Sequence, residues 1–155
     1  MRKFLALALI GVLVLLATSA SAPQVQQEKQ ISCVMDIAVV CTADWSDCWW
    51  EGPVTGCMLA GMVEFRENPA TFPGKTQHFS EDFKFTPTAG GWIKGVDDGV
   101  WNFSTFKFRA NGWVTQTSPE WAGLVGAKFH EMGTTTDPNG WPILGTGTTM
   151  TLHKP

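Results

Sequence analysis

The sequence has no tyrosine, little charge and no run of basic residues. It carries 11 Lys and Arg against 14 Asp and Glu, and two of the basic residues lie within the first three positions. Nucleic acids and anionic membrane surfaces are bound by clustered Lys and Arg, so the composition argues against both as partners. Beyond residue 22 no apolar stretch is long enough to span a bilayer, and we expect no stable membrane insertion there.

Several chemical motifs are also missing. The cysteines lack the paired two-residue gaps of zinc sites, and the three histidines would meet on a metal only if their strands were adjacent and in register. No serine has the flanking glycines of a hydrolase nucleophile elbow, and no glycine-rich phosphate loop precedes a helix. We therefore expect no metal and no cofactor, and the sequence leaves open whether the protein is an enzyme.

The first 22 residues have the pattern of a signal peptide. Arg2 and Lys3 precede an apolar run over residues 4–16, and small residues follow to Ala22. A cut after Ala20 is favoured, because Pro23 would hinder one after Ala22; a retained anchor is the alternative. We expect a flexible lead-in over residues 23–30, one domain over residues 31–155, and a secreted or periplasmic, cell-envelope location.

Four cysteines, Cys33, Cys41, Cys48 and Cys57, lie close together in the exported part. Four thiols in an oxidising compartment indicate two disulfides. Cys33 and Cys41 on one extended strand would stand roughly 26 Å apart, which excludes their pairing. We favour Cys33–Cys57 with Cys41–Cys48 and keep Cys33–Cys48 with Cys41–Cys57 as the alternative.

Eight Trp, ten Phe and 16 Gly, with few helix-forming runs, are typical of short strands joined by tight turns. The clearest alternation covers residues 77–86, where Phe79, Phe83 and Phe85 share one side. Asn111-Gly112 predicts a two-residue hairpin turn, with a bulge near Ser104, and Asp97-Asp98-Gly99 predicts another turn. We expect strands at residues 33–43, 56–66, 77–86, 92–96, 100–110, 113–117, 123–132 and 145–153. This all-β pattern favours a single antiparallel β-barrel of about eight strands, because closure removes exposed edges; a β-sandwich is the alternative.

The segment from Gly56 to Leu152 resembles the allene oxide cyclase-like barrel group, which includes dirigent-type proteins and uncharacterised bacterial members. The resemblance is carried by residues 63–65, by Thr76-Gln77-His78-Phe79-Ser80, by residues 95–101 and by Gly145-Thr146-Gly147-Thr148. It implies an eight-stranded barrel, often with an apolar cavity for small ring-forming or terpenoid-like molecules. It transfers no catalytic residues, and it leaves out the cysteine segment.

Glu81 is the candidate catalytic residue, because period two places it on the side of Phe79 and Phe83. Inside a barrel its pKa would rise through loss of water. A bulge could instead turn it outward, or Arg109 or Lys107 could pair with it inside. Arg109 and Lys107 share one face of a strand, as Glu64 and Arg66 do, and a solvated outer face is the plainer interpretation. The expected ligand-binding residues are Phe79, Glu81, Phe83, Phe85, Trp92, Trp101, Phe106 and Arg109.

Three functions follow from these expectations. The first is binding of a small apolar molecule in the aromatic cavity, with Glu81 fixing a polar end. The second is an interaction module of the envelope that presents exposed rings such as Trp49, Trp50 or Trp141. The third is a cyclase or isomerase in which Glu81 moves a proton. The oligomeric state is left open.

Overall fold

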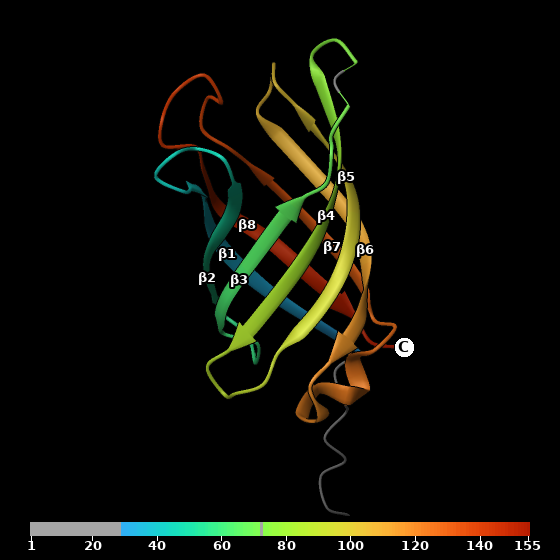
Figure 1. Cartoon of the computed structure of the whole chain (residues 1–155). Helices are drawn as coiled ribbons and strands as arrows, with labels where there is room; N and C mark the ends of the chain where they lie inside the picture. The colour runs from blue at the N-terminus through green and yellow to red at the C-terminus, as the bar shows by residue number, and fades with distance from the viewer. Residues whose placement is uncertain (1–28, 72) are drawn as a thin grey trace, which may run out of the picture.

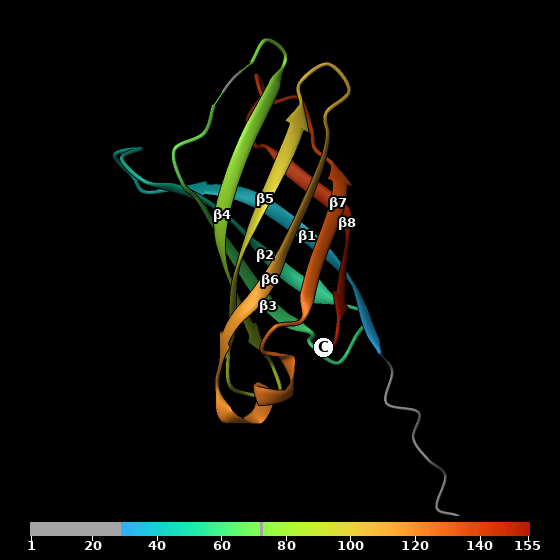
Figure 2. The same cartoon turned by 90° about the vertical axis from the view of Figure 1, so that its right-hand side faces the viewer.

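A computed structural model describes residues 29–71 and 73–155 of the chain. The expected signal peptide and most of the lead-in lie outside the described residues. Eight strands form a closed antiparallel barrel in which each strand pairs with its neighbours in sequence (Figures 1 and 2). The elements are β1 (Gln30–Cys41), β2 (Cys48–Thr55), β3 (Gly61–Glu67), β4 (Thr76–Pro87), β5 (Ile93–Asn102), β6 (Lys107–Thr117), the short 3₁₀ helix η1 (Pro119–Leu124), β7 (Lys128–Thr134) and β8 (Leu144–His153).

The barrel closes where β1 pairs with β8, with Gln30 opposite His153 and Cys33 opposite Met150. Closure gives every strand two partners, which confirms the predicted barrel and excludes the sandwich. Within the described residues, no helix is both long and apolar enough to cross a membrane.

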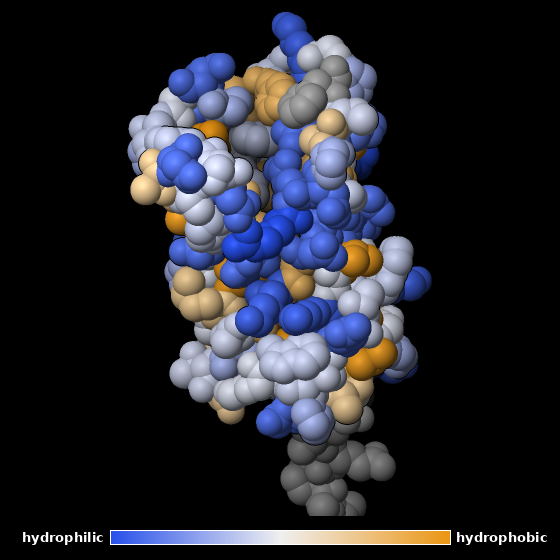
Figure 3. Space-filling view, in the orientation of Figure 1, coloured by the Kyte–Doolittle hydropathy of each residue, from blue (hydrophilic) through white to orange (hydrophobic). Residues whose placement is uncertain are grey.

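Strand β4 shows why the chain folds this way. Its residues alternate strictly, with Phe79, Phe83 and Phe85 buried inside and His78 and Lys84 exposed outside. The outer side chains of β3 and β4 form a polar band, in which Glu64 faces Lys84 and Arg66 faces Asp82. Figure 3 shows this band across the middle of the barrel wall. The predicted solvated outer face of Glu64 and Arg66 is therefore confirmed.

Aromatic rings fill the part of the barrel around the C-terminal end of β4, which is the lower half in the orientation of Figure 1. Phe83 stacks on Phe129 with ring centroids 4.5 Å apart, and Phe65 and Phe85 pack around them. Such pairs contribute about 0.5–1.5 kcal/mol each beyond their buried area. Gly95 makes room for this cluster, because a Cβ atom there would lie 2.1 Å from Cζ of Phe83.

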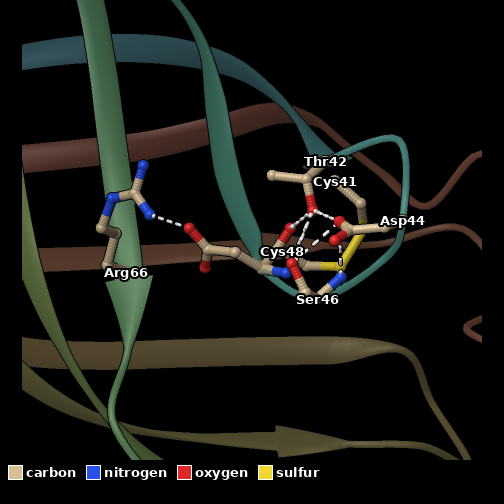
Figure 4. Close-up of a disulfide and its surroundings, with 7 residues drawn as sticks. Cys41, Thr42, Asp44, Ser46, Cys48 and Arg66 are labelled. Carbon is tan, nitrogen blue, oxygen red and sulfur yellow. Dashed lines mark hydrogen bonds and ion pairs between the residues drawn. A yellow bond between two sulfur atoms is a disulfide. The ribbon is translucent and has the colours of Figure 1, made fainter.

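Two disulfides join Cys33 to Cys57 and Cys41 to Cys48, the favoured pairing. The first links β1 to the turn after β2, and the second closes the β1–β2 loop shown in Figure 4. Inside that loop the hydroxyls of Thr42 and Ser46 donate to Asp44 and lower its pKa to about 2. Two disulfides indicate an oxidising environment, extracellular or periplasmic.

Two predicted turns are wrong, because strands run through them. Asn111-Gly112 lies inside β6 and Asp97-Asp98-Gly99 inside β5. Gly112 is needed for close approach of two strands: a Cβ atom there would lie 1.9 Å from the backbone oxygen of Val96. The β5–β6 turn falls at residues 103–106, where Phe106 has a φ of 58°, and the bulge lies at Lys94/Gly95 instead of near Ser104.

Candidate functional site

Three carboxyl groups meet inside the barrel, above the packed rings. The register places Glu81 of β4 directly opposite Asp97 of β5, and both residues point inward. Glu131 enters from β7, where it alternates with Phe129 and lies opposite Ala110 and Met150. Carboxylate oxygens of the three residues lie within 4.8 Å of one another. We call Glu81, Asp97 and Glu131 the carboxyl cluster.

The cluster is deeply buried and poorly compensated. Glu81 is 5% exposed, Asp97 1% and Glu131 2%. Both carboxylate oxygens of Asp97 and Oε2 of Glu131 have no hydrogen-bond partner among the described residues. The buried polar side chains of residues 29–71 and 73–155 include no Lys, Arg or His that could neutralise the cluster. Each unpaired buried charge costs several kcal/mol, so this arrangement needs either protons or a bound cation.

Burial raises the pKa of all three groups. For Glu81 and Glu131 the pKa lies well above the ordinary glutamate value, chiefly because water is excluded and secondarily because other carboxyls are near. Loss of water, followed by the nearby charges of Asp98 and Asp82, raises the pKa of Asp97 to about 8. Without a cation, the cluster therefore holds protons at neutral pH.

A cavity of about 20 Å³ borders the cluster, and we call it the inner cavity. This volume suits one water molecule or one ion. Aromatic side chains make most of its wall, and carboxyls make the polar part. Its lining residues are Ile37, Trp50, Phe65, Glu67, Phe79, Glu81, Trp101, Phe108, Glu131 and Thr135.

A wider depression of about 180 Å³, the mouth pocket, borders the inner cavity. Residues that line it belong to the ends of β3 and β5 and the starts of β2 and β4, and these segments lie toward the upper end of the barrel in Figure 1. The mouth pocket is lined by Val39, Cys48, Trp49, Trp50, Glu67, Gln77 and Trp101. Hydrophobic side chains show between polar loops at this end in Figure 3. The rings of Trp50 and Trp101 meet edge to face at 5.8 Å, and both border the inner cavity as well. The mouth pocket therefore leads toward the cluster.

Polar groups at this boundary are arranged around Glu67. Gln77 Nε2 donates to the Glu67 carboxylate at 2.7 Å. Partial loss of water raises the pKa of Glu67, and hydrogen bonds from Trp50 and Gln77 oppose that rise. Trp101 Nε1 is buried and has no hydrogen-bond partner in the described part of the chain. The boundary thus offers one unused donor beside several acceptors.

The structure brings some predicted site residues together and separates others. Phe79, Glu81 and Trp101 line the inner cavity, whereas Phe83 and Phe85 belong to the packed cluster below. Trp92 lies before β5 at the opposite end, with Lys94 Nζ 5.2 Å from its ring.

Phe106 lies in the turn before β6 and does not line the inner cavity. Phe108, two residues further on, lines it instead, while Arg109 and Lys107 are exposed on the outer face. Neither of these cations is an internal partner of Glu81. His78 and His153 are also exposed, and His130 bonds outward to Asn111 at 2.8 Å.

Sequence reasoning missed Asp97 and Glu131 as site residues. Asp97 was interpreted as part of a turn, yet it alternates in phase with Ile93 and Trp101 along β5. Glu131 alternates in phase with Phe129 along β7. The alternation of inward and outward residues along each strand therefore indicated that both side chains point inward. For Asp97 the turn-like Asp-Asp-Gly sequence obscured this alternation.

Comparisons with known proteins give no further guide to the site. No protein-family model, curated protein or solved structure matches the chain.

Proposed function

We propose that the protein is exported to the periplasm, the cell envelope or the exterior and binds a small, mostly apolar molecule at the mouth of the barrel. The apolar part would lie against Trp50 and Trp101, and a polar group would point toward Glu81. The observation that carries the proposal is the aromatic mouth pocket, which shares Trp50, Glu67 and Trp101 with the inner cavity beside the carboxyl cluster. Such a mixture of apolar walls and a few convergent polar groups is typical of ligand sites.

The volume limits the ligand to about one or two rings. A cavity of about 150 Å³ takes benzene, and the mouth pocket has about 180 Å³. The inner cavity admits only a single small polar group or ion. A ligand that buries roughly 150 Å² of apolar surface gains about 4 kcal/mol, and one hydrogen bond to a neutral carboxyl adds about 0.5–1.5 kcal/mol. We therefore expect dissociation constants of about 0.1–1 mM.

Hydrogen-bond chemistry favours a ligand with a donor group. Glu67 supplies acceptor oxygens between the mouth pocket and the inner cavity, the protonated carboxyls of Glu81 and Glu131 keep carbonyl acceptors in the inner cavity, and Trp101 Nε1 supplies one unused donor. Aromatic alcohols and amines match this set better than hydrocarbons of equal size. Indole, phenol, benzylamine and toluene form a suitable series of probes.

Tryptophan fluorescence and two-dimensional NMR of the exported, oxidised protein test the proposal with these four probes. We expect saturable changes that are strongest for the donor-bearing probes and at least tenfold weaker in Trp101→Ala. Trp113→Phe is the matched control, because Trp113 lies on the outer wall and is 50% exposed. Absence of saturation for all probes, or equal binding by Trp101→Ala, would refute the proposal.

A second candidate function is proton transfer by Glu81 in a cyclase- or isomerase-type reaction. It is favoured by the position of the Glu81 carboxyl in the wall of an aromatic cavity. Any molecule that binds at the mouth would be incubated with the protein and analysed by mass spectrometry and NMR for an isomer of equal mass. Product formation by the wild type and its loss in Glu81→Gln would support this function, and equal turnover in both would exclude Glu81.

The remaining candidate is an envelope interaction module. Trp45 and Trp141 are 62% and 55% exposed, and their rings meet at 5.0 Å on two neighbouring loops. Of the rings expected to be exposed, Trp141 is on the surface, Trp50 is buried, and Trp49 is half-buried beneath Arg66. Loss of envelope association in a Trp45→Ala, Trp141→Ala variant that still binds the probes would favour this function.

A further inference from the structure

We propose that Glu81, Asp97 and Glu131 bind one divalent cation of calcium size inside the barrel. The inference goes beyond the small molecule proposed for the mouth pocket, because it concerns the deeper carboxyl cluster and needs no organic ligand. Four observations carry it: the spacing of the oxygens, their lack of partners, the absence of a buried base among the described residues, and the ion-sized cavity beside them.

The spacing of the oxygens fits an ion of this size. Calcium binds oxygen at about 2.3–2.6 Å, so ligands on opposite sides of the ion stand about 4.6–5.2 Å apart. Magnesium binds at about 2.0–2.1 Å, which brings opposite ligands to about 4.0–4.2 Å. Oxygens of the three residues lie within 4.8 Å of one another, close enough for one ion to contact all three. Magnesium keeps several waters and is usually held by one or two carboxylates, whereas calcium accepts more protein oxygens, so a set of three carboxylates favours calcium.

The unpartnered oxygens point to a ligand independently of the spacing. Asp97 is 1% exposed, and neither of its carboxylate oxygens has a hydrogen-bond partner in the described residues; the same holds for Oε2 of Glu131. Three carboxyls that simply shared protons would be expected to hydrogen-bond to one another, because buried polar groups are nearly always paired. A central cation would satisfy all of these oxygens at once.

Charge and ligand type decide which cation is suitable. All three carboxylates are buried, and those of Glu81 and Glu131 line the inner cavity together with aromatic rings. Three such groups call for more than one positive charge, and a divalent ion supplies two. An all-oxygen set prefers calcium, magnesium or manganese over zinc or copper, which favour nitrogen and sulfur ligands. Thr135 lines the same cavity, and the remaining coordination positions would be filled by water, as is usual for calcium.

The route to the cluster runs from the mouth pocket past Glu67. Glu67 lies opposite Glu81 in the register of β3 and β4 and borders both the mouth pocket and the inner cavity. An anionic side chain at this point attracts a cation toward the interior. Glu67→Gln should therefore slow calcium association while changing the equilibrium affinity less than a change within the cluster.

The test uses oxidised protein dialysed against a chelator, with calcium, magnesium or zinc added singly. Isothermal titration should show one calcium ion bound per chain. Terbium, a calcium-sized ion, should give luminescence excited through Trp50 and Trp101, and excess calcium should displace it. Glu131→Gln and Asp97→Asn should each weaken calcium binding at least tenfold. Asp98→Asn is the matched control, because Asp98 is the next residue on β5 and is exposed.

The outcomes separate this inference from the proposed function. Lack of saturable calcium binding, or unchanged binding in both Glu131→Gln and Asp97→Asn, overturns the cation site. Binding of magnesium with equal affinity overturns the size argument. Circular dichroism and the four aromatic probes check folding and the mouth pocket in each variant. If the probes bind and calcium does not, the cation inference fails and the proposed function stands. If calcium binds and none of the probes does, the proposed function fails and the cation site stands.

Discussion

Asn in place of Asp97 offers the sharpest test of the electrostatics of the barrel. Asp97 has a pKa raised from 3.8 to about 8, so it keeps its proton in the folded protein and loses it in the unfolded chain across that interval. The unfolded chain then binds fewer protons than the folded one, and the free energy of unfolding must fall as pH rises. The stabilisation is complete below pH 4 and is lost as the pH approaches 8. Asp97→Asn removes this titration.

The magnitude follows from the size of the pKa change. An interval of about four pH units, at about 1.4 kcal/mol each, corresponds to a loss on the order of 6 kcal/mol. This is comparable with the whole stability of many small domains. At roughly 3 °C per kcal/mol, the melting temperature of metal-free wild type should fall on the order of 15–20 °C between pH 4 and pH 8.5. Glu81 from β4 and Glu131 from β7 face Asp97 and change in the same direction.

Calorimetry of chelator-treated protein from pH 4 to pH 8.5 provides the measurement. Asp97→Asn should show a much flatter pH dependence than the wild type and should be the more stable of the two at pH 8.5. Asp98→Asn should retain most of the wild-type slope, because Asp98 is exposed and adds only a secondary rise to the pKa of Asp97. A wild-type melting temperature that is constant or increases over this range would refute the reasoning. So would an Asp97→Asn variant with the wild-type slope.

Three further predictions concern the scaffold. Gly95→Ala should lower the free energy of unfolding by about 1–3 kcal/mol, because the added Cβ would lie 2.1 Å from Cζ of Phe83; urea denaturation measures this, and an unchanged midpoint would contradict it. Replacing Cys33 and Cys57 by Ala should lower the free energy of unfolding by about 2–4 kcal/mol in the same assay. A smaller decrease would contradict a structural role for that disulfide. Arg66→Ala should lower the free energy of unfolding by less than about 1 kcal/mol, because the ion pairs of Arg66 are exposed. A decrease above about 2 kcal/mol would contradict this expectation and show that the outer polar band stabilises the fold.

The fold could be predicted from the sequence because most of its strands follow simple rules. Alternation over residues 77–86 matches β4, and the cysteine spacing led to the pairing that the structure shows. Predictions failed where a local signal had two physical meanings. Asn111-Gly112 is the usual composition of a tight turn, but here the glycine permits close contact between β5 and β6. Only the tertiary packing distinguishes these two uses of glycine.

The candidate site could be predicted only in part. Glu81 was found because its strand alternates without interruption, and Phe79 and Trp101 were found beside it. The meeting of Glu81 with Asp97 depends on the register between two strands, and the approach of Glu131 depends on barrel closure. Neither the register nor the closure is encoded within a short stretch of sequence. A single inward acid was therefore accessible to sequence reasoning, whereas a cluster of three was not.

The two halves of the barrel have opposite energetics, and this contrast points to where function lies. The lower half is filled by stacked phenylalanines, a low-energy arrangement with its rings in contact. The upper half contains three buried carboxyls, and oxygens of Asp97 and Glu131 have no hydrogen-bond partner among the described residues, although apolar side chains of similar volume would be less costly. Local rules of good packing are broken mainly at functional sites. The packed half and the disulfides stabilise the scaffold, and the carboxyl cluster is stabilised fully only when it holds protons or a cation.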